Sequence, residues 1–205
     1  PEIEKEPVGE LRKSVWAYPH VLLGALGIFV YVGAEVGNAG LIVNYLRTPE
    51  NGGLSAEEAS RFASIYWGGA MIGRFFAAVM LSDIKSVRKK LQYVAAILVL
   101  ALFSGAFVTD WTWKYGVFFL IIALINVIIM QIGAGRDTRV LATFAAVAAI
   151  LALVTAFTTG QVAIWTVVSI GLFNSVMFPT IFSLGVKDLQ KSELSKASGI
   201  INSLI

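Results

Sequence analysis

The sequence predicts an all-α protein, a polytopic bundle of transmembrane helices, and two observations carry this prediction. Hydrophobic residues make up 57% of the 205 residues and charged residues only 14%, whereas soluble domains carry about 25% charged residues. The apolar residues gather in long stretches without the two-residue alternation of barrel strands, which leaves a helical bundle as the spanning structure. The same composition excludes a disordered chain, which needs low hydrophobicity and high charge.

The apolar stretches divide into six expected spans, each close to the roughly 20 residues that a bilayer requires. The run 91–132 is too long for one helix, and the polar and aromatic residues between Asp110 and Lys114 divide it into a two-helix hairpin. The expected spans are 19–46, 61–81, 91–108, 114–132, 140–158 and 162–186. Before the second span, Ser55 and Glu58 have the spacing of a capping box, so Ser55 is expected to cap the second helix with Glu58 at position N3.

Two regions flank the spans. Residues 1–18 are polar and are expected to form a cytoplasmic tail, with residues 19–205 as the transmembrane domain. The last apolar run, beginning at residue 197, ends after about nine residues, which is less than half a span. We therefore expect the chain to be a fragment that ends inside a seventh membrane helix.

The cations set the expected orientation of the helices. With the N-terminus in the cytoplasm, twelve Lys and Arg residues fall on the inner side and three, Arg47, Arg61 and Lys114, fall on the outer side. This is the bias that the positive-inside rule describes. The inner cations are Lys5, Arg12, Lys13, Lys85, Arg88, Lys89, Lys90, Arg136, Arg139, Lys187, Lys191 and Lys196.

Polar residues in the first span are candidates for a binding site. Glu35 falls near the bilayer midplane, where an ionisable side chain is costly and suggests function. Tyr31, Asn38 and Tyr45 have helical spacings that place them on its face. Carboxylate, amide and phenol groups complement the hydroxyls of a polyhydroxylated ligand. Alternatively, Glu35 is protonated or bonded to a neighbouring helix and never meets substrate.

The second span presents two different faces. Gly69 and Gly73 form a GxxxG surface on which another helix can pack closely. Trp67 and Arg74 lie on another face, where the indole can stack on a sugar ring or simply pack in the bundle. For Arg74 we expect a structural or gating role.

The sixth span carries Asn174 and, five residues later, Pro179. A proline removes one N–H group and frees a carbonyl one turn earlier, so a kink is expected there. A kink beside an asparagine is consistent with a gate next to a binding site. The alternative is an asparagine that only forms a hydrogen bond between helices.

Catalytic and metal-binding groups are scarce. The chain has no Cys and one His, and it shows neither an HExxH motif nor a paired-carboxylate cluster. We therefore expect no enzyme, no metal site and no cofactor, and we expect no nucleic-acid partner.

Three long strings resemble the fucose/galactose/glucose permease family of sugar:proton symporters in the major facilitator superfamily. They are YVGAEVGNAGLIVNYL at 31–46, YWGGAMIGRF at 66–75 and IGLFNSVMFPTIFSLGVKDL at 170–189. They look like helices seven, eight and ten of the twelve-helix pattern. The chain would then be the C-terminal half, truncated in helix eleven, with the hairpin 91–132 as an addition.

The resemblance implies proton-coupled uptake of a neutral hexose or deoxyhexose (fucose, galactose or glucose) by alternating access. The expected partners are the sugar, the lipid bilayer and the missing N-terminal half of the same polypeptide, with the proton as coupling ion. The expected location is a bacterial inner membrane. The alternatives are an efflux or other-solute transporter of the superfamily, a membrane-embedded enzyme, and a non-catalytic structural or channel-like subunit.

Overall fold

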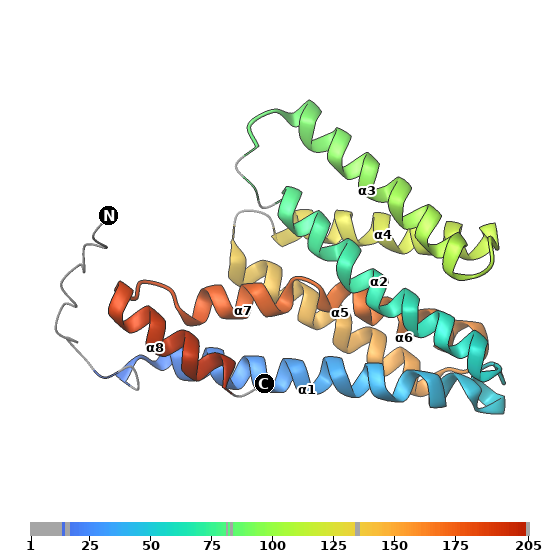
Figure 1. Cartoon of the computed structure of the whole chain (residues 1–205), viewed down its shortest axis with the longest axis horizontal. Coiled ribbons are helices and arrows are strands. Elements are labelled where there is room, and N and C mark those ends of the chain that lie inside the picture. Colours follow the sequence, from blue (N-terminus) through green and yellow to red (C-terminus); the bar gives the residue numbers. More distant parts are fainter. Residues whose placement is uncertain (1–13, 15–16, 81, 83, 134–135, 204–205) are drawn as a thin grey trace, which may run out of the picture. The chain divides into compact units, whose positions relative to one another are not determined.

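The computed structural model describes residues 14, 17–80, 82, 84–133 and 136–203, and the statements below refer to these residues. Most of the expected cytoplasmic tail 1–18 lies outside them, as do residues 81 and 204–205. The described chain consists of helices, turns and short connections without a β-strand (Figure 1). The predicted all-α fold class is thereby confirmed.

The helices follow one another with short connections. They are α1 (Pro19–Arg47), the 3-10 helix η2 (Pro49–Asn51), α2 (Ala56–Met80), α3 (Val87–Val108), α4 (Trp113–Gly133), α5 (Asp137–Phe157), α6 (Gly160–Asn174), α7 (Met177–Gly185) and α8 (Lys191–Asn202).

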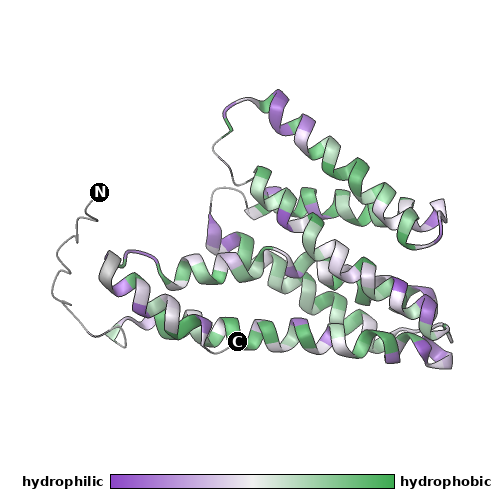
Figure 2. Ribbon diagram, in the orientation of Figure 1, coloured by the Kyte–Doolittle hydropathy of each residue, from purple (hydrophilic) through white to green (hydrophobic). Residues whose placement is uncertain are grey.

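Six helical stretches in the described chain are long and apolar enough to cross a membrane, with α6 and α7 together forming the sixth. Each corresponds to an expected span. Figure 2 shows hydrophilic residues in the first turns of α3 and α5 and mostly hydrophobic residues along the rest of both helices. The chain is therefore an integral, multi-pass membrane protein.

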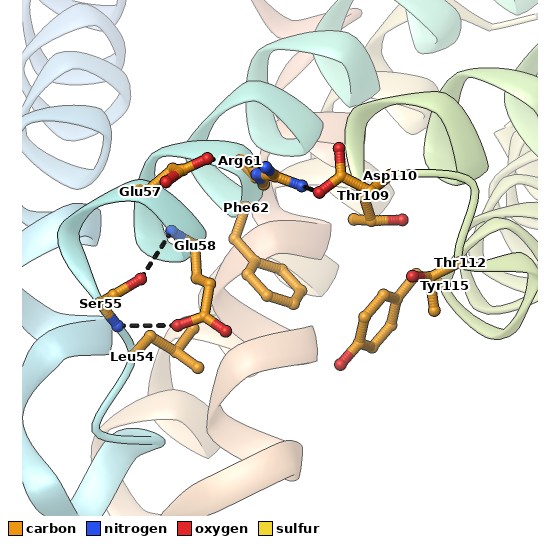
Figure 3. A pocket seen from close by; sticks show the side chains of 10 residues that line it. All are labelled: Leu54, Ser55, Glu57, Glu58, Arg61, Phe62, Thr109, Asp110, Thr112 and Tyr115. Carbon is orange, nitrogen blue, oxygen red and sulfur yellow. Dashed lines mark hydrogen bonds and ion pairs between the residues drawn. The ribbon is translucent and has the colours of Figure 1, made fainter.

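The helix α2 begins at Ala56, directly after the predicted cap Ser55 and before the apolar stretch that begins at residue 61. The capping box explains the extra turn. The Glu58 amide donates to Ser55 Oγ at 3.2 Å, and the Ser55 amide donates to Glu58 Oε2 at 2.9 Å (Figure 3). Amide groups in the first turn that would otherwise lack partners are thus satisfied, and the polar residues before the apolar stretch become helical.

The chain divides into two compact units, which are described separately. The first comprises residues 1–33 and 178–205, and the second comprises residues 34–177. In the first unit, α1 and α7 meet at two glycines: a Cβ atom added at Gly24 would lie 2.8 Å from Gly185 Cα. Tyr18 donates its hydroxyl proton to Glu193 Oε1 at 2.8 Å, which links the start of α1 to α8.

In the second unit, α2 to α6 pack in succession, with α2 also lying against α6. Small residues make this last contact close: the backbone of Leu172 lies 3.1 Å from the position of a Cβ added at Gly69, and Gly171 lies directly against the Tyr66 carbonyl. Gly73 likewise lies against Ser175. The GxxxG surface of α2 therefore faces α6, as close helix packing in membranes requires.

Candidate functional site

A chain of buried polar groups connects α1, α2 and α6 inside the second unit. Asn174 Nδ2 donates to the Tyr66 hydroxyl at 3.2 Å, and this hydroxyl donates to the Glu35 carbonyl at 3.1 Å. Tyr66 is fully buried, and Glu35 and Asn174 are 8% and 5% exposed. Two residues predicted separately as site candidates are thus brought together by a third.

Tyr66 is not among the site residues predicted from the sequence. A signal was present, because Tyr66 has the helical spacing to share the face of Gly69 and Gly73. A phenol on a close-packed glycine face is buried, and a buried hydroxyl needs a hydrogen-bond partner. That requirement pointed to a polar group on the facing helix, which is Asn174.

The Glu35 carboxylate is the unsatisfied part of this arrangement. Its Oε1 atom is buried and has no hydrogen-bond partner within the described chain. Burying a carboxylate oxygen without a hydrogen-bond partner costs free energy. A donor from a ligand would remove this cost. On the same helix, Cβ atoms added at Gly37 and Gly40 would meet nothing within 4 Å. The backbone of α1 is therefore open to an approaching molecule just beyond Glu35.

The other candidates in this unit lie at its surface. Asn38, one turn beyond Glu35, is half-buried, and Arg74 is exposed. Trp67 is 48% exposed, and its ring lies edge-on to Tyr66 with 5.6 Å between the centroids. Trp67 and Arg74 therefore share an accessible face of α2 that points away from the buried chain.

Tyr45 departs from the expected polar face. Its hydroxyl group donates to the Thr155 carbonyl of α5 at 2.8 Å and therefore bonds to the protein itself. The helical period explains the departure. Ten residues at 3.6 per turn carry Tyr45 about 80° around the helix from Glu35, which is enough to direct it to a different neighbour.

Tyr31 and Pro179 belong to the first unit. The Tyr31 side chain is buried, and its ring packs against Phe178 with 6.3 Å between the centroids. Pro179 lies in the first turn of α7. The helix is interrupted between Asn174 and Met177. Pro179 has no N–H group to donate to the carbonyl four residues earlier, and that carbonyl belongs to Ser175, inside the interruption.

The end of α6 is supported by side chains. The Leu172 carbonyl accepts the Ser175 hydroxyl at 2.6 Å and Asn126 Nδ2 at 3.3 Å. Asn126 is fully buried in α4. Both bonds hold the last turn of α6, and they therefore fix the position of Asn174.

A separate pocket of about 500 Å³ lies at the N-terminal end of α2, next to the turn between α3 and α4 (Figure 3). Arg61 bridges Glu57, at 2.8 Å, and Asp110. Within the described chain, no three His, Cys, Asp or Glu side chains gather closely enough to hold a metal ion. The pocket contains none of the predicted binding residues, and its ion pairs tie the hairpin α3–α4 to α2.

Fold and site together define a class of protein: a multi-pass helical membrane protein with a buried carboxylate and an interrupted helix, features found around the midplane sites of transporters. The comparisons agree with this class. The chain is 36% identical over 200 residues to the glucose/galactose transporter of Brucella abortus biovar 1 (strain 9-941), which covers 97% of this chain. The same identity is found with the glucose/galactose transporter of Brucella abortus (strain 2308).

A shorter match, 37% identical over 67 residues, links 33% of the chain to 15% of the L-fucose-proton symporter of Escherichia coli (strain K12). No family model matches the chain, and no solved structure matches it significantly. The chain spans 36% of the length of the Brucella relatives. The resemblance predicted from the sequence is confirmed: the chain is homologous to sugar transporters, and its relatives carry the names of transporters rather than enzymes.

Proposed function

We propose that this chain is part of a secondary active transporter that takes up a neutral hexose or deoxyhexose together with protons. The chain supplies one half of an alternating-access bundle, and the N-terminal half of the transporter completes the sugar site from the other side. The transporter works in a bacterial inner membrane. The names of the relatives support glucose, galactose and fucose as the sugars to test.

The observation that carries the proposal is the unpartnered carboxylate oxygen of Glu35. A sugar hydroxyl donates to this oxygen and thereby supplies the missing partner. Tyr66 and Asn174 hold the adjoining backbone and the end of α6 in place through their two hydrogen bonds. The proposed site thus has a rigid, buried support beneath the group that meets the ligand.

The surface candidates have secondary roles in this proposal. Asn38 adds an amide that both donates and accepts, one turn from Glu35. Trp67 offers an exposed indole face for the C–H surface of a sugar ring. Arg74, exposed two turns beyond Trp67 on α2, acts in gating rather than in sugar binding. For Tyr31 in sugar binding and Pro179 in gating, the roles predicted from the sequence stay predictions.

The proposal is tested by uptake of labelled fucose, galactose and glucose into proteoliposomes that contain the full-length protein. We expect one of these sugars to accumulate, and we expect an inward proton gradient to stimulate its accumulation. Equal uptake with and without the proton gradient would contradict proton coupling. Absence of uptake of all three sugars by demonstrably folded protein would overturn sugar transport and favour an efflux or other-solute transporter.

A further inference from the structure

A second cavity of about 510 Å³ lies between α4, α5 and α6, apart from the buried chain that links Glu35 to Asn174. We propose that this groove holds one anionic phospholipid, with the phosphate at Lys114, the ester groups beside Trp165 and an acyl chain along the isoleucines of α4. Its volume falls within the range of about 300–1,000 Å³ that is usual for small-molecule sites.

The long wall of the groove is apolar and lies within the membrane. Ile122, Ile125 and Ile129 follow one another at helical spacing along α4, and Val147 and Leu151 of α5 also line the cavity. Such a surface suits a hydrocarbon chain, whereas a sugar would leave its hydroxyls there without partners.

The polar end of the groove is formed by Lys114 and Gln161, in the first turns of α4 and α6. Lys114 is exposed, makes no ion pair with any described residue and is the one charged residue in the lining. A cation near a helix N-terminus is at the unfavourable end of the helix dipole. A phosphate there compensates both positive charges, which is the complementarity that favours an anionic head group.

Trp165 lies between the polar end of the groove and its apolar wall. Its ring lines the groove and stacks on Phe118 with 5.0 Å between the centroids. Phe118 is one helical turn below Lys114, which is about 6 Å deeper at 1.5 Å per residue. The Trp165 indole nitrogen is buried and has no acceptor within the described chain. An ester carbonyl, which lies below the phosphate of a phospholipid, is a group that can supply that acceptor at this depth.

The order of chemistry along the groove therefore matches the order along a phospholipid: cation for phosphate, indole N–H for ester, and branched aliphatic side chains for the acyl chain. Because α4 belongs to the hairpin α3–α4, this site gives the hairpin a role in retaining a lipid against α5 and α6.

The test is native mass spectrometry of the full-length protein, purified in mild detergent and titrated with dioleoylphosphatidylglycerol or dioleoylphosphatidylcholine. We expect one retained lipid with about a fivefold preference for the anionic one, which Lys114→Gln removes. Lys89→Gln, an exposed cation in the first turn of α3, is the matched control and leaves the preference unchanged.

The acyl part of the site is tested by filling the groove. We expect Ile125→Trp to abolish retention of both lipids, while Leu153→Trp, on the exposed surface of α5 outside the groove lining, retains them. An unchanged preference in Lys114→Gln would overturn the head-group assignment. Retention by Ile125→Trp equal to that of Leu153→Trp would overturn the groove as the lipid site.

Discussion

Replacing Glu35 by glutamine is expected to weaken sugar uptake by the full-length transporter by about tenfold to a hundredfold. Glutamine keeps the size of the side chain but replaces one acceptor oxygen by an NH2 group, which cannot accept a hydrogen bond from a sugar hydroxyl. Leaving a buried hydrogen-bonding group without its partner costs about 1–3 kcal/mol, and each 1.4 kcal/mol corresponds to about a tenfold change in affinity. The measurement is the concentration dependence of uptake in proteoliposomes.

The Glu35 variant has a matched control and a separate structural readout. Glu50→Gln changes a carboxylate in the exposed 3-10 helix η2 and is expected to leave uptake unchanged. Because Glu35 Oε1 has no partner within the described protein, Glu35→Gln should not lower thermal stability. A variant that unfolds more easily while its uptake per folded molecule is normal would show that Glu35 serves packing and not sugar.

Replacing Gly171 by alanine is expected to have the largest effect on stability. A Cβ atom at this position would overlap the backbone carbonyl of Tyr66, which cannot rotate away as a side chain can. Extra atoms in a close-packed contact cost about 1–3 kcal/mol, and we expect the upper end of this range here because α2 or α6 has to shift. The measurement is the free energy of unfolding in a denaturant titration.

Gly68→Ala is the control for this prediction, because a Cβ atom there would meet nothing within 4 Å. Alanine also favours the helix over glycine, so this variant is expected to be as stable as the parent or slightly more stable. Equal stabilities of the Gly171 and Gly68 variants would mean that the close contact between α2 and α6 is not present in the membrane. The position assigned to Tyr66 and Asn174 would then lose its basis.

The spans could be predicted from sequence because the bilayer imposes a length and a composition on each of them. The capping box of Ser55 and Glu58 was also readable, because both of its bonds are local. It also indicated that the second helix begins directly after Ser55, before the apolar stretch, and α2 begins at Ala56. Local sequence patterns therefore predicted the helices and most of their boundaries.

The candidate site was only partly accessible from sequence. Glu35 and Asn174 stood out as polar groups in apolar helices, but the group that joins them, Tyr66, comes from a third helix. Its bonds depend on the close packing of α2 against α6, which a one-helix pattern does not contain. Tyr45 shows the same limit, since its drift around α1 matters only once α5 is in place to accept its hydroxyl proton.

Whether Glu35 lies in the sugar site is tested most directly by chemical protection. A hydrophobic carbodiimide modifies carboxyl groups in apolar surroundings, and mass spectrometry of the full-length protein measures the modification at each residue. At ten times its dissociation constant, the transported sugar should lower the labelling of Glu35 about tenfold. The labelling of Glu193, a buried carboxyl group in the other unit, should stay the same. Equal labelling of Glu35 with and without saturating sugar, in protein that transports that sugar, would contradict the proposed site.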